Sequence, residues 1–415
     1  MALSDSASDV VDVQRVDASS SMAPSLGDPR LPKDVWPDIV SHLSHESIEN
    51  AMFVCRYFRT LAQPYFFRML AIKPFNVENR FLLSCSSRDE EDSSWIWRKL
   101  KFYSSPTIAR HVQFCRISPF RRLDGYSIPE SHDRDCGLAI VDAIFELLPQ
   151  FTNLKEIDLD SVDLTEENIK QLSRIHHFDT VSITDCNMTA TPIRLAVQRV
   201  VLQSHFALPR GNSSLQLLSS LLQPAVTECL CLNDGAAVAA FFDLASRLPP
   251  LRHLHTLYIN ISCTDVTSFV SLLPQLPALR EITVDKARGG SYPYSSPLPP
   301  STLPLLESYE GPLHLAEYFC QGRPIRHLKL TGMSTADDIF RHLQNLRSSS
   351  TGLESLGFHV GVVDKPLLQR LFDKRVGFPQ IKALEITFDM IDHKASLSAA
   401  NQAPLDSKKN HSRRC

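Results

Sequence analysis

The sequence predicts an α/β protein in which a small helical module precedes a long array of strand–helix units. Two observations carry the second part: a short apolar pattern recurs ten times from Leu154 onwards, and helical patterns lie between its copies. The first part follows from a dense apolar block between Leu31 and about Phe67. A length of 415 residues agrees, since it exceeds that of one ordinary domain.

The recurring pattern is L-x-x-L-x-L, with aliphatic or aromatic substitutes. Its copies begin at Leu154, Phe178, Val197, Thr227, Leu254, Leu279, Leu306, Ile325, Leu353 and Ile381. Successive copies start 19 to 30 residues apart, which is in the range of leucine-rich repeats. The alternation at the end of each copy indicates a half-buried strand. The copy at Leu306 is degraded, because Gly311 takes its last apolar position.

Between these strands the apolar period becomes helical. Stripes at helical spacing are formed by Phe241, Phe242, Ala245 and Leu248, by Val266, Phe269, Val270 and Leu273, and by Ile339, Leu343 and Leu346. Strand–helix units of this size bury their apolar faces only by stacking on one another. The pattern therefore predicts a right-handed, leucine-rich-repeat-like solenoid over residues 107–391. A doubly wound α/β domain is the alternative, because it also alternates strands and helices.

Composition argues against several classes of protein. Hydrophobic residues make up 43% and charged residues 21%, as in ordinary soluble proteins. The formal net charge of −3 gives no basic excess for nucleic acid or anionic lipid. We find no signal peptide and no apolar run near the roughly 20 residues of a membrane-spanning helix. We therefore expect no nucleic-acid or membrane partner, and a cytoplasmic or nuclear location, or both.

The ten cysteines contain no C-x-x-C pair. They are expected to be reduced structural thiols rather than ligands of a zinc ribbon. The other segments are expected as a disordered leader at 1–28, a helical module at 29–73, a linker with an acidic, serine-rich loop at 74–106, and a polar tail with a basic end at 392–415.

Two apolar stripes mark the helical block. Val35, Ile39 and Leu43 recur at i, i+4 and i+8. A second stripe consists of Ile48, Ala51, Cys55, Phe58 and Ala62, and Pro64 is expected to end it. A segment of about 40 residues rarely builds a sufficient core alone. The surplus of apolar residues indicates that a partner completes one face, although a subdomain packed on the solenoid is an alternative.

The same block resembles the F-box family. The resemblance rests on Leu31-Pro32-Lys33-Asp34-Val35-Trp36-Pro37-Asp38-Ile39, then Leu43, then Val54-Cys55-Arg56-Tyr57-Phe58-Arg59-Thr60-Leu61-Ala62. It implies a three-helix module that docks on a Skp-type adaptor of a Skp–cullin–F-box ubiquitin ligase. The implied adaptor-binding residues are Leu31, Pro32, Val35, Ile39, Leu43, Val54, Cys55, Phe58 and Leu61. The segment from Leu303 to Leu330 is similar to the irregular repeats of mushroom-type fungal F-box proteins.

The sequence shows no motif of a catalytic or phosphate-binding site. His253 and His255 are too few for a metal site, and the acids after Asp158 lack the central glycine of a calcium loop. We therefore expect no catalytic residue, no cofactor and no metal. An enzyme with an unrecognised site remains an alternative.

A binding face can be predicted from the strand pattern alone. If the apolar positions of each copy face the core, the side chains between them face the open side of the sheet. The candidate target-binding residues on that side are Asp158, Asp160, Tyr258, Glu281, Asp285 and Lys329. A mixed polar surface with one aromatic suits a protein target. Together with this surface, the resemblance to the F-box family implies a non-catalytic substrate-recognition subunit of a ubiquitin ligase; the alternative is an F-box and repeat scaffold that works outside a ligase.

Overall fold

The chain forms two compact units in a computed structural model. The first ends at Tyr65 and the second begins at Phe66. The structure describes residues 32, 34–72, 95–118, 131–175, 178–188, 191–204, 213–261, 266–285, 298–334, 336–347, 352–360, 369 and 381–388. The expected leader and tail, Leu31, and residues 74–94 of the expected linker lie outside the described residues.

The described part of the first unit consists of three helices, as expected. They are α1 (Val35–Ser41), α2 (His45–Val54) and α3 (Arg56–Phe66), whose last residue lies beyond the unit. Ser44 caps α2 by accepting a hydrogen bond from the backbone N–H of Ser47 at 3.2 Å. Val40, Ile48 and Ala62 are the buried side chains, one from each helix.

The second stripe in this unit differs from the prediction in two ways. Cys55 is extended, with φ −162°, so the stripe is divided between α2 and α3. Pro64 does not end the run, because α3 continues to Phe66. A proline in the last turn removes one helical hydrogen bond, but so few residues follow it that the helix tolerates the loss.

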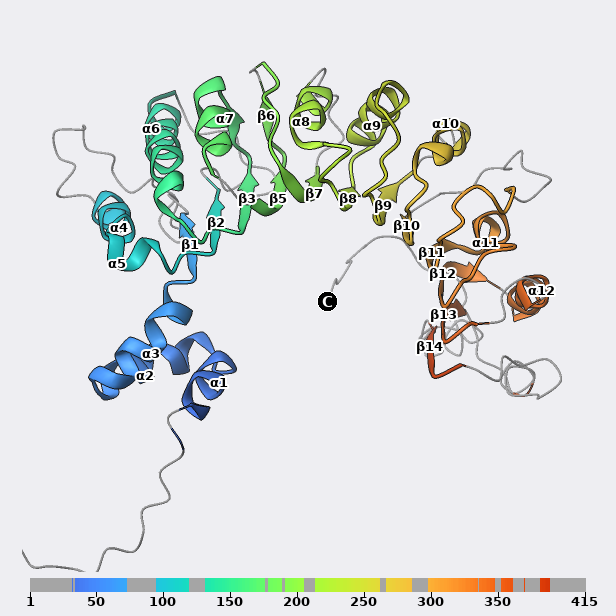
Figure 1. The fold of residues 1–415 in the computed structure, drawn as a ribbon, viewed down its shortest axis with the longest axis horizontal. Helices are drawn as coiled ribbons and strands as arrows, with labels where there is room; N and C mark the ends of the chain where they lie inside the picture. Colours follow the sequence, from blue (N-terminus) through green and yellow to red (C-terminus); the bar gives the residue numbers. More distant parts are fainter. Residues whose placement is uncertain are drawn as a thin grey trace, which may run out of the picture. The chain divides into compact units, whose positions relative to one another are not determined.

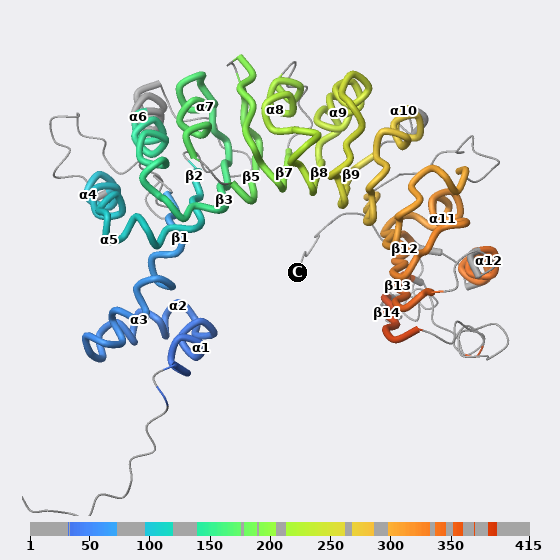
Figure 2. The backbone as a smooth tube through the Cα atoms, in the orientation of Figure 1, coloured from blue at the N-terminus to red at the C-terminus, as the bar shows by residue number. Residues whose placement is uncertain are grey.

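The second unit contains one sheet of twelve parallel strands. They are β1 (Met69–Ile72), β2 (Phe114–Ile117), β3 (Glu156–Asp160), β5 (Phe178–Thr184), β7 (Val197–Gln203), β8 (Cys229–Leu232), β9 (Thr256–Asn260), β10 (Glu281–Asp285), β11 (Ser308–Pro312), β12 (His327–Ser334), β13 (Ser355–Val360) and β14 (Ala383–Phe388). They follow one another in chain order across the sheet, as the colour sequence in Figure 2 shows. A doubly wound sheet reverses its order at a switch point, and this sheet does not.

All ten predicted strands are confirmed, and equivalent positions of the pattern lie opposite one another in neighbouring strands. Ile157 of β3 lies opposite Val181 of β5, which lies opposite Val200 of β7. The same position continues through Leu230, Leu257, Ile282, Tyr309, Leu328, Leu356 and Leu384. Each copy of the pattern therefore supplies one layer of a continuous core.

The strands β1 and β2 were not predicted. Both fit the same pattern, through Phe67, Leu70 and Ile72 and through Val112, Cys115 and Ile117, and all six side chains are buried. The copies starting at Phe67, Val112 and Leu154 are more than 40 residues apart, so the wider spacing conceals the periodicity. The expected linker also includes the helix α4 (Trp95–Tyr103), whose Ile96 lies in the core.

Helices cover one side of this sheet. They are α4, α5 (Pro106–Ala109), α6 (Ser131–Leu147), α7 (Glu166–Ser173), α8 (Ser213–Leu221), α9 (Gly235–Arg247), α10 (Val266–Leu272), α11 (Leu313–Cys320) and α12 (Ala336–Arg347), with the 3-10 helices η2 (Leu148–Gln150) and η3 (Leu273–Gln275). The helical stripes predicted between strands correspond to α9, α10 and α12. In Figure 1 the larger helices line the same side, and no described helix of this unit covers the other.

A second sheet of two short strands, β4 (Asp163–Leu164) and β6 (Asn187–Met188), lies beyond the ends of β3 and β5. Ser161 and Asp185 precede these strands, and both have positive φ, at 58° and 53°. Consecutive repeats thus turn in the same way after the strand.

Arg323 is a buried cation that holds the loop before β11 in place. Its side chain is 1% exposed. The guanidinium donates to the carbonyls of Thr302 at 2.7 Å, Pro299 at 2.9 Å and Gln321 at 3.0 Å. These bonds connect the loop before β11 to the end of α11.

Candidate functional site

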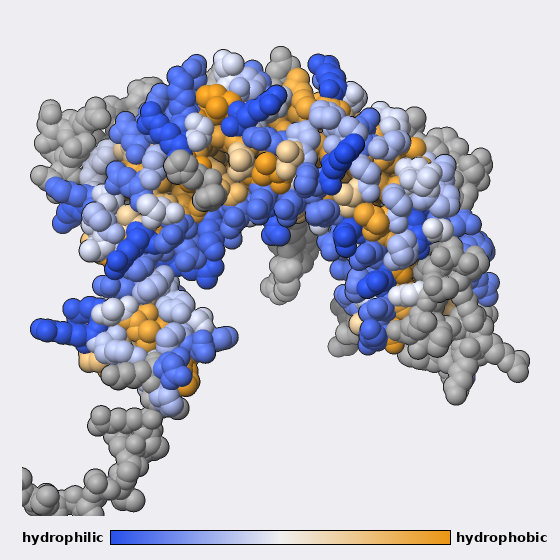
Figure 3. Space-filling view, in the orientation of Figure 1, coloured by the Kyte–Doolittle hydropathy of each residue, from blue (hydrophilic) through white to orange (hydrophobic). Residues whose placement is uncertain are grey.

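An apolar patch lies where α2 meets α3. Phe53, Val54 and Tyr57 have exposed fractions of 76%, 68% and 42%, and Cys55 between them is exposed too. We call these four residues the junction patch. Apolar (orange) atoms reach the surface of this helical unit in Figure 3. Clustered exposed apolar side chains mark protein interaction sites more often than isolated ones do.

The junction patch is supported from within its own unit. The rings of Trp36 and Phe58 meet edge to face with centroids 4.9 Å apart, which joins α1 to α3. The hydroxyl of Tyr65 donates to the carbonyl of Pro37 at 3.3 Å. Arg59 Nε donates to the carbonyl of Met52 at 3.3 Å and so connects α3 back to α2. The exposed side chains are therefore presented by helices that are fixed to one another.

The second candidate surface is the side of the sheet that lacks helices, which we call the open face. In β3 the side chains of Ile157 and Leu159 are buried, whereas Glu156, Asp158 and Asp160 are not. Strands β2, β8, β9, β10 and β11 show the same alternation. The strand side of this unit is mostly hydrophilic (blue) in Figure 3.

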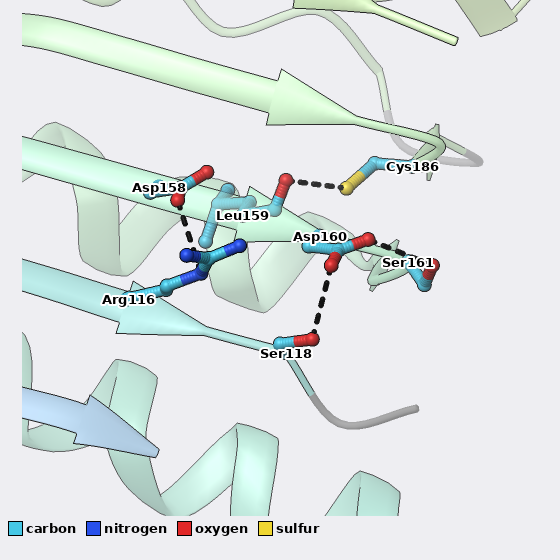
Figure 4. A network of polar contacts seen from close by, with 7 residues as sticks. All are labelled: Arg116, Ser118, Asp158, Leu159, Asp160, Ser161 and Cys186. Atoms are coloured by element: carbon cyan, nitrogen blue, oxygen red, sulfur yellow. Dashed lines mark hydrogen bonds and ion pairs between the residues drawn. The ribbon is translucent and has the colours of Figure 1, made fainter. Parts of the chain in front are cut away.

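Polar contacts orient the carboxylates of β3 (Figure 4). Arg116 Nε of β2 pairs with Asp158 Oδ2 at 3.2 Å. Asp160 accepts hydrogen bonds from the hydroxyls of Ser118 at 3.1 Å and Ser161 at 3.0 Å. Burial raises the pKa of Asp158, and the Arg116 guanidinium opposes this rise. Two hydroxyls therefore orient the Asp160 carboxylate, and none of the described cations contacts it.

The next polar group in the same unit lies on β9 and β10. The hydroxyl of Tyr258 donates to Asp285 Oδ2 at 3.2 Å, and that of Thr256 donates to Glu281 Oε2 at 3.2 Å. Burial first, and then the negative charge of Asp285, raise the pKa of Tyr258 to about 12. The phenol therefore remains a neutral donor at physiological pH, and the pair presents a ring beside a carboxylate.

Lys329 on β12 is already engaged by an acid of the open face. Its Nζ lies 3.1 Å from Glu310 Oε1 of β11. Hydrogen bonding to Glu310, together with its charge, raises the pKa of Lys329. Lys329 is therefore less available to a target than an unpaired lysine.

The predicted target-binding residues form separate groups. Asp158 and Asp160 share β3, whereas Tyr258, Glu281 and Asp285 lie together on β9 and β10. Three strands, β5, β7 and β8, separate these groups, and Lys329 lies two strands beyond β10. The two groups are therefore separate elements of one face, not one pocket.

Sequence reasoning missed Arg116 and Glu310, which partner two of the predicted residues. Arg116 lies on the unpredicted β2. Glu310 lies on the degraded copy, where the buried Tyr309 ring occupies the space of a larger side chain at Gly311. The signal for both was their place in the pattern, at the fifth position of their copies.

Within the described ranges, no three His, Cys, Asp or Glu side chains are grouped as metal ligands. The helices that the structure describes are all too short or too polar to cross a bilayer. The six described cysteines, Cys55, Cys115, Cys186, Cys229, Cys231 and Cys320, are free thiols.

Comparison with protein families identifies the first unit. Residues 28–73 match the family model described as F-box-like. The chain carries an F-box-like domain. The matched range includes the three helices α1 to α3 and also β1, the first strand of the sheet. No curated protein matches the chain.

In the F-box-like domain, the expected adaptor-binding residues differ in how far their side chains are exposed. Pro32, Val54 and Cys55 are exposed, and the last two belong to the junction patch. Val35, Ile39, Leu43, Phe58 and Leu61 are partly buried. Val40, which lies outside the predicted stripe, takes the inward position of α1. Phe53 and Tyr57 are exposed members of the patch that the sequence analysis did not select.

Proposed function

We propose that the chain is the substrate-recognition subunit of a Skp–cullin–F-box ubiquitin ligase. In this proposal the F-box-like domain docks on a Skp-type adaptor, and the α/β unit is a right-handed, leucine-rich-repeat-like solenoid that binds a protein target. The ligase partners supply the catalytic chemistry, so the chain itself is not an enzyme and needs no cofactor. In this role it works in the cytoplasm, the nucleus or both.

The junction patch is the observation that carries this proposal. F-box domains typically bind Skp-type adaptors, and the patch lies inside the range that matches the F-box-like model. Phe53 and Val54 are among the most exposed large apolar side chains of the described chain. Covering them with an apolar partner removes that surface from water, which favours association by about 25 cal/mol for each Å² buried.

The repeat architecture supports the second half of the proposal. Twelve parallel strands in chain order, with helices along one side, are what stacked strand–helix units produce. Right-handed crossovers are nearly universal for parallel strands. Such a unit leaves one broad sheet face free, and solenoids commonly use an extended face of this kind for binding.

Substitutions at the junction patch test adaptor docking directly. Phe53→Asp and Val54→Asp each place a carboxylate in the buried interface, and we expect at least a tenfold loss of affinity for a purified Skp-type adaptor. Because both side chains are exposed, neither variant should lower the melting temperature appreciably. Affinity is measured by isothermal titration calorimetry.

Leu305→Asp is the matched control, because Leu305 is also an exposed large apolar residue, at 43%, but lies in the second unit. Unchanged adaptor affinity in both patch variants would overturn the docking assignment. If the wild-type chain binds the adaptor but does not assemble with a cullin, the scaffold function outside a ligase is favoured instead.

A further inference from the structure

A row of side chains runs along the strand ends on the open face, and its residue types differ from those of the rest of the face. Asp160, Thr184 and Gln203 lie side by side on β3, β5 and β7. The row continues one residue after β8 with Asn233, and then with Asn260 and Asp285, which are paired on β9 and β10. We call it the edge row. It has a carboxylate at each end, the buried Thr184 beside Asp160, and three neighbouring carboxamides between Thr184 and Asp285.

The carboxamide of Asn233 lacks a partner. Its Oδ1 atom is buried and accepts no hydrogen bond from the residues that the structure describes. A buried acceptor without a donor costs free energy, and a ligand N–H recovers that cost if the Asn233 side chain turns outward on binding. Side-chain amides offer both donors and acceptors, and an extended peptide presents both along its backbone. The centre of the edge row therefore suits the main chain of a peptide.

An apolar row lies beside the three carboxamides. Val201, Cys231 and Tyr258 are paired with one another across β7, β8 and β9, two residues before the carboxamides. All three side chains are partly exposed. An aliphatic side chain of a bound peptide can rest against this row while its backbone meets the amides.

The net charge of the open face favours a basic peptide. Between β2 and β12 its outward positions hold six carboxylates, Glu156, Asp158, Asp160, Glu281, Asp285 and Glu310, and three bases, Arg116, Arg199 and Lys329, so the formal charge is −3. Arg116 and Lys329 are already paired with acids of the face. Asp160 and Asp285, at the ends of the edge row, accept hydrogen bonds only from hydroxyls in the contacts described above. A cationic ligand complements this arrangement, whereas nucleic acid and acidic peptides are repelled.

We propose that the open face binds an extended, basic segment of a partner protein across β3 to β10. Two cationic side chains of the segment meet Asp160 and Asp285, its backbone meets the carboxamides, and an apolar side chain rests on the row that contains Tyr258. The two carboxylates are five strand spacings apart, or about 24 Å, which an extended peptide covers in about seven residues. This inference deepens the proposed function and rests on it, because it specifies the chemistry of the target.

Labelled peptides test the proposal on the full-length chain. One probe carries two arginines about seven residues apart with a leucine midway. A second has the same composition with the arginines adjacent, and a third has glutamate in place of both arginines. By fluorescence anisotropy at low ionic strength, we expect the first to bind about tenfold more tightly than the second, and the third not to bind.

Variants connect that binding to the edge row. We expect Asp160→Asn and Asp285→Asn to weaken the first probe about three- to fivefold each, and less so at high salt. Asn233→Ala should weaken it at all salt concentrations, because its loss is not ionic. Asp243→Asn is the control, since it removes a carboxylate from α9 on the helical side.

Equal binding of the three probes, or wild-type affinity in an Asp160→Asn, Asp285→Asn double variant, would overturn the proposal. The Val54→Asp variant separates this result from the adaptor question. Probe binding in that variant should equal that of wild type, whether or not adaptor binding is lost. Loss of adaptor binding therefore tests the ligase role, and loss of probe discrimination tests the open face.

Discussion

Tyr258 and Asp285 are coupled across neighbouring strands, with the phenol hydroxyl 3.2 Å from Asp285 Oδ2. The pair connects the apolar row to one end of the edge row. Because the phenol donates to Asp285, the hydrogen bond fixes the position of the carboxylate. The pair is therefore part of the proposed binding surface, and the titration of Tyr258 reports on that surface.

Alkaline titration should detect this coupling. The folded-state pKa of Tyr258 is raised to about 12, whereas an unfolded tyrosine has a pKa of about 10. The folded state thus keeps a proton that the unfolded state loses, so this stabilising contribution is complete below pH 10 and is lost as the pH rises towards 12. Tyr258→Phe should therefore lose less stability than wild type between about pH 10 and 12, as measured by urea denaturation.

Asp285→Asn provides a second check on the same group. Removing the charge should lower the pKa of Tyr258 only in part, because burial is the larger cause of the shift. The pKa is measured by NMR of ring-labelled tyrosine, with the Tyr258→Phe spectrum as the assignment. An unchanged pKa would mean that the two side chains do not interact in solution.

Arg323 is expected to be a major contributor to the stability of the second unit. Arg323→Met removes the donor from several partly buried carbonyls, and we expect a loss of about 2–4 kcal/mol in the free energy of unfolding. Arg323→Lys should be intermediate, because an ammonium cannot reproduce the planar fork. Arg280→Met, at an exposed ion pair with Glu307, is the control and should change stability by less than about 1 kcal/mol. A similar loss in both methionine variants would argue against a specific role for Arg323.

Gly311 should not tolerate a side chain. A Cβ atom there would lie 2.6 Å from the Tyr309 hydroxyl oxygen and 3.1 Å from the Val284 carbonyl oxygen. Gly311→Ala should therefore destabilise the protein by about 1–3 kcal/mol in chemical denaturation. Gly235→Ala is the matched control, since nothing lies within 4 Å of its Cβ position at the start of α9. Equal stability of the two variants would refute this packing account.

Truncation after Asp285 tests the continuity of the second unit. The cut removes β11 and its hydrogen bonds to β10, together with Phe319, whose ring centroid lies 5.8 Å from that of Phe269. The new end exposes an apolar layer, so we expect insoluble or partly unfolded protein. A soluble fragment with one sharp thermal transition would instead show a domain boundary at this point.

The strands were predictable where spacing and apolar type agreed, as at Leu254, Leu257 and Ile259. The strands β1 and β2 escaped because inserted segments conceal the period, although Cys115 occupies an apolar position of the pattern. Side-chain pairing was less accessible. Nothing in the local sequence indicates that Lys329 is engaged by Glu310, because that contact depends on which strands become neighbours.

In the F-box-like domain, the period of the first stripe selected Ile39, which is partly buried, and did not select Val40, which is the buried residue of α1. A helix of seven residues is too short for its period to fix which side faces the core. The break at Cys55 was also invisible, because the i, i+3 and i+4 spacings continue across it. The sequence therefore indicated an apolar surplus without showing that Phe53 lies at the surface.

The chain-order arrangement of the sheet makes the distance between Asp160 and Asp285 adjustable in evolution. Four strands lie between β3 and β10, and each bonds only to its neighbours in the sequence. Gain or loss of one strand–helix unit would change the separation of the two carboxylates by about 4.8 Å, without altering the contacts of either one. A lineage could thus retune its receptor to longer or shorter ligands by duplicating an internal segment, and keep both ends of the recognition surface intact.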